Sequence, residues 1–265
     1  MNSVHFASLF GVDCDMDLAY HWIEHYRAYH FNSYSVWLHS ASGNTSNIAT
    51  AKRLFTAKGF LVTIVKGKFR DGGLRQTCLE NFRESLDPTD YLVTADSDEF
   101  HDMPWDYALY IREYDIVFGR LVDRYDHTLH AARPDELLSY QFPFSGDVEG
   151  EIIKTVSPRY AANWPRVKKD KIMASRADIR VAFGGSHQLE SEPVRELHYT
   201  KVNRVFHYSW RDSIIERMAG KNYFHAAHVW YVHDFFGGGE LPRSLTDLIA
   251  KEESEQIYKG WVPCN

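Results

Sequence analysis

The chain has 265 residues, of which 44% are hydrophobic and 15% aromatic, and these proportions exclude an intrinsically disordered chain. Its net charge of −6 argues against duplex DNA as a broad electrostatic partner. The three cysteines fit neither a zinc site nor a disulfide framework, and no apolar run approaches the about 18 residues of a membrane span. We therefore expect a globular, cytoplasmic protein without a signal peptide or a membrane span.

The first hundred residues alternate between strand-like and helix-like patterns. Aromatic and β-branched residues mark the expected strands, and apolar residues recur every three to four positions in the expected helices. Gly59 is placed to end the second helix. In chain order, the expected strands are 4–12, 34–39, 60–65 and 91–95, and the expected helices are 18–29, 48–55 and 74–86.

This alternation predicts the α/β class. Short connections and right-handed crossovers give an open, mostly parallel sheet with helices on both faces. In such sheets, ligands bind beyond the carboxyl ends of the strands. Polar residues directly after strands are therefore candidates for a site.

The second half of the chain is less regular. Its expected strands are 115–122, 179–183 and 202–208, and its expected C-terminal helices are 214–218 and 245–258. No repeat or low-complexity linker separates the two halves, so we expect a single domain over 1–265. Within it, 1–100 is the regular half and 101–265 is the less regular half with the C-terminal helices.

The fourth expected strand stops at an acidic segment that contains Asp96, Asp98 and Glu99. One interpretation is a solvated turn, or a cap by Asp98 of a helix within 105–114. The other is a cation site, because buried carboxylates without a partner are costly. Mg²⁺ and Mn²⁺ take oxygen ligands and bridge carboxylates to a diphosphate. The position after a strand favours an enzyme that handles a nucleoside diphosphate.

Two basic features are candidates for contact with phosphates. Arg75 lies near the start of the third expected helix, where it reaches either a phosphate or a surface salt bridge. A basic run extends over 159–180 and includes Lys171. Such a run is usually a solvated face, and here it is also a candidate contact for the diphosphate or for a phosphate-bearing acceptor.

The segment 96–100, Asp-X-Asp-Glu-Phe, and the pattern before it resemble the nucleotide-sugar-binding half of GT-A-fold glycosyltransferases. The similarity is to the family 2-like group, and it continues in the segments 119–124, 184–187 and 206–217. Members of the group often carry an Asn-Glu pair after the first strand and an Asp after the second. This chain has Asp13-Cys14-Asp15 and Ser40-Ala41-Ser42 at those places.

The resemblance implies a GT-A (Rossmann-like) fold in which 1–100 is the nucleotide-sugar-binding half and 101–265 the acceptor half. It also implies transfer of a sugar, with inversion, from a nucleoside diphosphate sugar to an acceptor hydroxyl. A UDP-sugar comes first among the donors, and the acceptor is a glycan, a lipid-linked glycan, a protein or a modified nucleic-acid base. The implied cofactor is Mn²⁺ or Mg²⁺. The implied metal ligands are Asp96, Asp98 and a histidine, for which His187 is preferred over its rival His207.

The same resemblance suggests the other roles in the site. Glu99 and Asp147 are the candidate catalytic carboxylates. Glu99 could instead orient Asp98 or bond a backbone amide, and Asp147 is a candidate only because it lies in a loop of the acceptor half. Trp210 fills either the site or the core. The candidate donor contacts are Asp13, Ser42, Arg75, Asp96, Lys171, Trp210 and Arg211.

Three other functions compete with a glycosyltransferase. A sugar-nucleotide nucleotidyltransferase needs a glycine-rich, basic loop after the first strand, whereas this chain has Asp13-Cys14-Asp15. A phosphohydrolase with an Asp-X-Asp nucleophile carries that motif after its first strand. A non-catalytic carbohydrate-binding module would use the aromatic residues, and it leaves the acidic segment unexplained.

Overall fold

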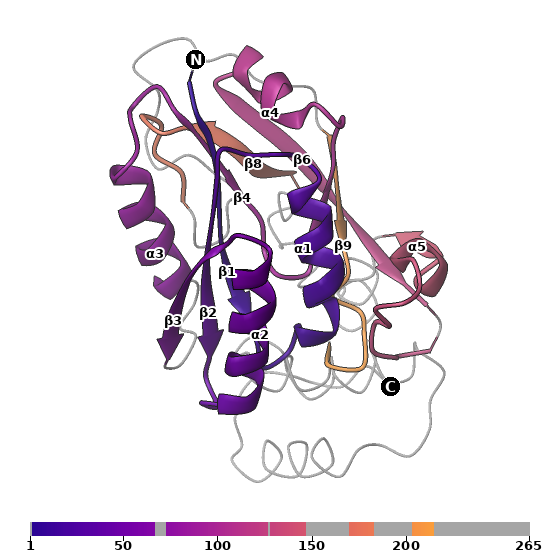
Figure 1. The fold of residues 1–265 in the computed structure, drawn as a ribbon. Helices are drawn as coiled ribbons and strands as arrows, with labels where there is room; N and C mark the ends of the chain where they lie inside the picture. Colours follow the sequence, from indigo (N-terminus) through magenta and orange to yellow (C-terminus); the bar gives the residue numbers. More distant parts are fainter. Residues whose placement is uncertain (1, 67–72, 127, 147–169, 183–202, 215–265) are drawn as a thin grey trace, which may run out of the picture.

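The computed structural model describes residues 2–66, 73–126, 128–146, 170–182 and 203–214. These residues form one mixed α/β unit around a sheet (Figure 1). The strands follow the order β3-β2-β1-β4-β8-β6-β9-β5, and β7 pairs with β6. Their bounds are β1 Val4–Gly11, β2 Ser33–Ser40, β3 Leu61–Lys66, β4 Tyr91–Thr94, β5 Glu99–Asp102, β6 Ile116–Tyr125, β7 Phe144–Gly146, β8 Asp170–Arg176 and β9 Asn203–His207.

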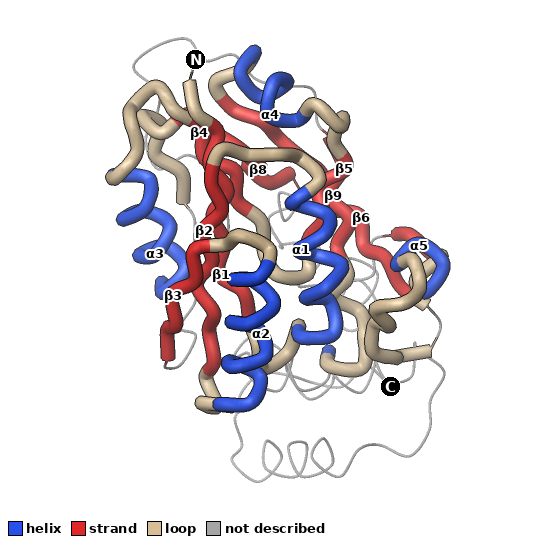
Figure 2. Tube along the Cα trace, viewed as in Figure 1, coloured by secondary structure: helices blue, strands red, loops and turns tan. Residues whose placement is uncertain are grey.

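Among the described residues, the longer helices lie in the first half of the chain, where they connect successive parallel strands, as Figure 2 shows. Two short 3₁₀ segments, Met16–Leu18 and Ile111–Glu113, accompany them. Every helix in the described part of the chain is too short or too polar to span a lipid bilayer. The helices are α1 Ala19–Arg27, α2 Thr45–Ala57, α3 Gly73–Glu84, α4 Tyr107–Tyr110 and α5 Leu138–Gln141.

The predicted α/β class and parallel arrangement are confirmed for the first half of the chain. Strand β1 pairs in parallel with β2 and β4, and β2 pairs in parallel with β3. The second half makes the sheet mixed, because β8 runs antiparallel between β4 and β6. Strand β9 is parallel to β6 and antiparallel to the edge strand β5.

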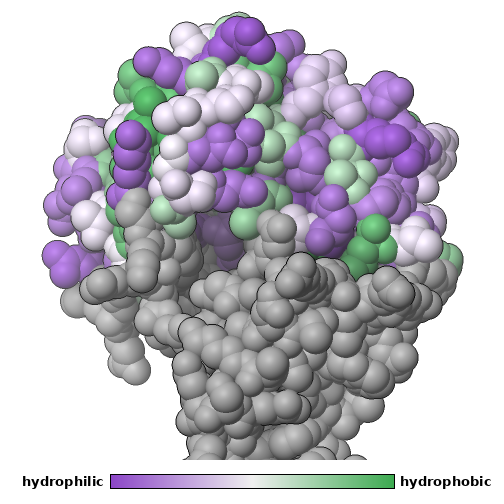
Figure 3. All heavy atoms as spheres, turned by 90° about the horizontal axis from the view of Figure 1, so that it is seen from below, coloured by the Kyte–Doolittle hydropathy of each residue, from purple (hydrophilic) through white to green (hydrophobic). Residues whose placement is uncertain are grey.

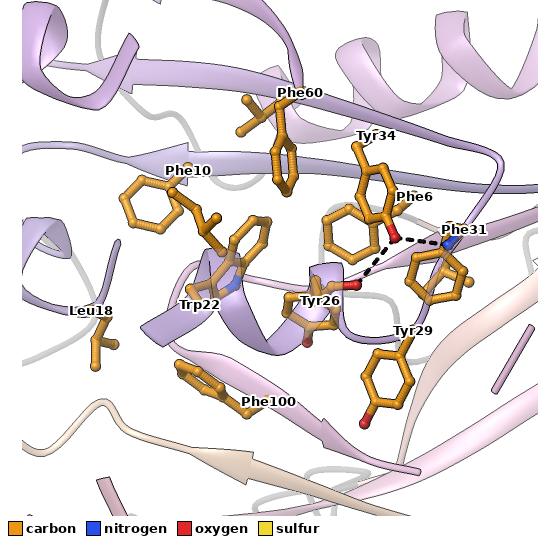
Figure 4. Close-up of a cluster of buried hydrophobic side chains, with 14 of the residues drawn as sticks. Phe6, Phe10, Leu18, Trp22, Tyr26, Tyr29, Phe31, Tyr34, Phe60 and Phe100 are labelled. Carbon is orange, nitrogen blue, oxygen red and sulfur yellow. Dashed lines mark hydrogen bonds between the residues drawn. The ribbon is translucent and has the colours of Figure 1, made fainter. Parts of the chain in front are cut away.

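Alternation along β1 divides the core into two layers. Phe6 and Phe10 point toward α1 and α2, where their rings lie 5.2 and 5.5 Å from that of Trp22 (Figure 4). Ala7 points to the opposite face and packs in a cluster with Leu79 of α3. Helices thus cover both faces of the parallel strands, and the aromatic residues of α1 fill the larger layer.

Local signals explain where α2 begins and ends. The side chain of Asn44 accepts a hydrogen bond from the amide of Asn47, which satisfies a free donor of the first turn. Gly59 has φ +80°, the left-handed conformation that ends a helix at little cost for glycine. The expected end of α2 is therefore confirmed.

Three strands differ from the sequence-based expectation, and the shortest of them, β7, is a three-residue strand that pairs with β6. The strand expected at 179–183 is wrong for its described part, where Ile179 lies in a bend and Val181 forms only an isolated β-bridge. The strand of this region is β8, inside the basic run. Charged residues at both ends of β8 hide its buried centre, Ile172–Ala174. Strand β5 was not expected, because its four residues begin within the acidic segment.

Asp98 does not cap a helix. The residue that precedes α4 is Asp106, and Asp98 lies in a turn between β4 and β5. The helices expected within 214–258 lie outside the described residues, apart from Ile214.

Candidate functional site

The acidic segment lies at the carboxyl end of β4, as the sequence predicts, and it forms a tight turn. The amide of Glu99 donates to the carbonyl of Asp96 at 3.1 Å, which closes the turn around Ser97 and Asp98. Figure 3 views the molecule from the end to which β1, β2 and β3 point, and hydrophilic residues predominate in its coloured part.

Asp96 lies between two cations that come from opposite halves of the chain. Its Oδ1 is 2.7 Å from Nε of Arg75 on α3, and its Oδ2 is 2.7 Å from Nζ of Lys171 on β8. Burial raises the pKa of Asp96, but the charges of Arg75 and Lys171 outweigh it and hold that pKa below its ordinary value. The structure therefore brings three of the candidate donor contacts together, with both cations directed at Asp96.

Glu99 is buried and holds the turn. Its Oε2 accepts a 3.0 Å hydrogen bond from the amide of Asp96, and its Oε1 contacts Nζ of Lys171. Burial raises the pKa of Glu99, the charge of Asp96 raises it further, and Lys171 opposes both effects. The alternative that Glu99 bonds a backbone amide is confirmed by this geometry, and the catalytic role stays a prediction.

The second half of the acidic segment meets a histidine. Nε2 of His207, at the end of β9, lies 3.4 Å from Oδ2 of Asp98, and its Nδ1 lies 2.7 Å from Oδ1 of Asp123 on β6. Burial alone would lower the pKa of His207, but the two carboxylates outweigh it and raise that pKa to about 10. Without a metal, His207 is therefore a cation at neutral pH.

The spacing of this donor pair is compatible with two ligands of one divalent ion. Two ligands of one Mg²⁺ or Mn²⁺, each about 2.1 Å from the ion and at right angles, lie about 3 Å apart, close to the observed separation. Asp123 supports the Nδ1 side of His207, an arrangement that presents Nε2 to metals in many proteins. Within the described ranges, no group of three His, Cys, Asp or Glu side chains could hold an ion. Substrate oxygens and water would complete its shell.

The loop after β1 contacts the loop after β2 through Asp13. Its carboxylate accepts hydrogen bonds from the hydroxyls of Ser40 and Ser42, both at 2.8 Å, and from the amide of Ala41 at 2.7 Å. Burial raises the pKa of Asp13, but these donors outweigh it and lower that pKa. The structure thus brings Asp13 and Ser42 together at the carboxyl ends of neighbouring strands.

Trp210 and Arg211 are buried, which favours the core alternative for Trp210 and corrects the expectation that Arg211 faces the donor. Trp210 is 4% exposed and Arg211 is fully buried. Nη2 of Arg211 lies 2.9 Å from Oδ1 of Asp15, and its Nε lies 2.9 Å from Oδ2 of Asp17. A guanidinium that binds two carboxylates inside the protein is not directed at a phosphate.

Two predicted site residues, Asp147 and His187, lie outside the described residues. The sequence analysis missed Asp123, which orients His207. A signal for it existed, because Asp123 lies within the family-like segment 119–124. It also missed Asp15 and Ser97, whose 2.5 Å hydrogen bond links the loop after β1 to the acidic turn.

Comparisons with known proteins yield matches among solved structures. No family model and no curated protein matches the chain. S. aureus TarS 1-349 is 11% identical with a TM-score of 0.38, over 98% of this chain and 72% of that one. Its complex with UDP-GlcNAc is 11% identical with a TM-score of 0.36, over 98% of this chain and 73% of that one. The structure of 4-diphosphocytidyl-2C-methyl-D-erythritol synthase is 14% identical with a TM-score of 0.33, over 67% of this chain and 77% of that one. At such TM-scores the similarity carries no functional argument, so the geometry of the site must carry it.

Proposed function

We propose that the protein is a metal-dependent glycosyltransferase that moves a sugar from a nucleoside diphosphate sugar to an acceptor hydroxyl. The observation that carries this proposal is the pair of Asp98 and His207, held 3.4 Å apart at the strand ends and supported by Asp123. A carboxylate and an imidazole together suit Mn²⁺ better than Mg²⁺, which prefers oxygen ligands.

The charge of the network supports a divalent ion. The network has two permanent cations, Arg75 and Lys171. Its four carboxylates are those of Asp96, Asp98, Glu99 and Asp123. With every carboxylate ionised and His207 neutral, an excess of two negative charges remains. A divalent ion balances this excess, whereas protonation of His207 balances half of it. The site therefore favours exchange of the His207 proton for a metal.

The roles of the residues follow from their contacts. Asp98 and His207 would hold the ion, which when bound neutralises charge on the diphosphate leaving group. Arg75 and Lys171 fix Asp96, whose side chain is 36% exposed and can meet the ribose or metal-bound water. The loop of Asp13 and Ser42 would contact the base and ribose. Asp147 remains the candidate base that accepts the acceptor proton.

The loop after β1 counts against a nucleotidyltransferase. That class needs a basic, glycine-rich loop to cradle a triphosphate. Here the loop carries the carboxylates of Asp13 and Asp15, which bind protein groups. A donor that arrives with its diphosphate already formed, such as a UDP-sugar, needs no such cradle.

Turnover tests the proposal. We would incubate the protein with UDP-sugars and Mn²⁺ and measure UDP release with and without pooled glycan acceptors. We expect metal-dependent release that Asp98→Asn abolishes. Asp102→Asn is the matched control, because Asp102 lies three residues after Glu99 and pairs with Arg204 at the surface. The proposal would be contradicted if UDP were released at the same rate with and without Mn²⁺, or if Asp98→Asn released UDP as fast as the parent protein.

A further inference from the structure

Three aspartates at alternate positions after β1 contact four separate segments of the chain. Asp13 binds the loop after β2. Asp15 binds Ser97 in the acidic turn and Arg211 beyond β9. Asp17 binds Arg211 and also accepts from the amide of Ala132 at 2.8 Å. This short segment thus connects the loop after β2, the acidic turn after β4 and the residues beyond β9.

The contact between Asp15 and Ser97 reaches the Asp98 side of the metal pair. Ser97 lies between Asp96 and Asp98, and its hydroxyl donates to Oδ2 of Asp15 at 2.5 Å. Both side chains are buried. A Cβ on Gly11 would lie 3.2 Å from Oδ2 of Asp15 and 3.7 Å from the Ser97 hydroxyl. The last residue of β1 therefore packs directly against this hydrogen bond.

The contact between Asp15 and Arg211 reaches the His207 side. Arg211 donates through Nη1 to the carbonyl of Tyr208, the residue directly after His207. The amide of Tyr208 in turn donates to the carbonyl of Asp98 at 2.8 Å. Arg211 is fully buried, so its position is fixed by these partners. The backbones on both sides of the candidate metal pair are therefore connected to one carboxylate.

We propose that Asp15 is a positioning residue, which acts through Ser97 and Arg211 to set the separation between Asp98 and His207. This inference rests on the proposed metal-dependent function. Its physical basis is that two ligands must be spaced for one ion before the ion arrives. Groups that orient metal ligands typically change metal affinity by about 10–100-fold when they are removed.

Ser97→Ala tests the inference with a small change. It removes the hydroxyl that binds Asp15 and leaves the ion pair of Asp15 with Arg211 in place. Ser33→Ala is the matched control, because the Ser33 hydroxyl also makes a 2.7 Å side-chain hydrogen bond, with His5 at the opposite end of the sheet. Free Mn²⁺ would be counted by its electron paramagnetic resonance signal in the presence of UDP, and the Tm of each variant measured beside it.

We expect Ser97→Ala to weaken Mn²⁺ binding about 10–100-fold, Ser33→Ala to leave it unchanged, and Ser97→Thr, which keeps the hydroxyl, to restore it. Equal Mn²⁺ affinity in Ser97→Ala and the parent protein would overturn the positioning role and leave the proposed function intact. Equal weakening by Ser97→Ala and Ser33→Ala would also overturn it. Absence of Mn²⁺ binding by the parent protein would instead refute the proposed function and this inference with it.

Discussion

Lys171 is the residue whose removal should expose the electrostatics of the site most clearly. Its ammonium contacts Asp96 and Glu99, and both it and Glu99 are almost fully buried. Removing one partner of a buried ion pair typically costs about 3–5 kcal/mol. Asp96 keeps Arg75 and Glu99 keeps the amide of Asp96, so we expect Lys171→Met to cost about 3 kcal/mol, at the low end of that range.

Thermal unfolding would measure this loss. For a chain of this size, each kcal/mol corresponds to about 2–4 °C, so the Tm should fall by about 6–12 °C. Arg120→Met is the control, because Arg120 pairs with Asp170 at 2.9 Å while its side chain is 60% exposed. Water screens such an exposed pair, so the Tm should change far less in this control.

The double variant Lys171→Met/Glu99→Gln adds a second test. Glu99 already has a raised pKa, and loss of Lys171 raises it further. The Glu99 carboxyl then binds its proton more tightly in the native state than in the unfolded chain. The stability lost in Lys171→Met should therefore grow as pH rises above the ordinary glutamate pKa. Glu99→Gln should therefore recover part of the stability at pH 8. If Lys171→Met lowers the Tm no more than Arg120→Met does, the buried network does not carry the stability assigned to it.

Three further predictions follow from the described contacts. Because the pKa of His207 is raised to about 10, its protonation should stabilise the native state fully below about pH 6.5. This stabilisation, at most about 5 kcal/mol, should be lost as pH rises through 10. Denaturant titrations from pH 6 to 10 should show the resulting fall in the free energy of unfolding for the metal-free parent protein and not for His207→Gln. Trp210→Ala should cost about 3–5 kcal/mol yet leave UDP affinity unchanged by calorimetry, and a selective loss of UDP binding would return Trp210 to the site. Gly119→Ala places a Cβ against Met173 and 2.6 Å from Val205, so it should destabilise the protein by about 1–3 kcal/mol. Gly146→Ala should have a smaller effect, because the atom nearest to the added Cβ is 3.8 Å away. Equal Tm values for the two variants would contradict this packing.

Much of the first half of the fold could be predicted from the sequence, because its signals are local. The β-branched run of β3, the helical spacing of Trp22 and Tyr26, and Gly59 after α2 each report on their own segment. The carboxyl end of β4 could also be predicted as a site, because the acidic segment follows an apolar run directly.

The contacts of the second half depend on partners distant in sequence. In the sequence, Lys171 belongs to a basic run of the kind that is usually solvated. In the structure, β8 pairs with β4 and brings Lys171 into contact with Asp96 and Glu99. Arg211 looks available for a phosphate until Asp15 and Asp17, almost two hundred residues earlier, meet its guanidinium. No local pattern reveals such neutralisation, because it arises when strands distant in sequence become neighbours.

Calorimetry of UDP binding tests the central claim, that Asp98 and His207 hold a divalent ion for a nucleoside diphosphate. UDP would be titrated into the protein with Mn²⁺ and with a chelator, for the parent chain, Asp98→Asn and the control Asp102→Asn. We predict that Mn²⁺ strengthens UDP binding at least tenfold in the parent and the control, and that Asp98→Asn removes this gain. UDP affinity that is the same with Mn²⁺ and with the chelator, or a metal effect that persists in Asp98→Asn, would contradict the account.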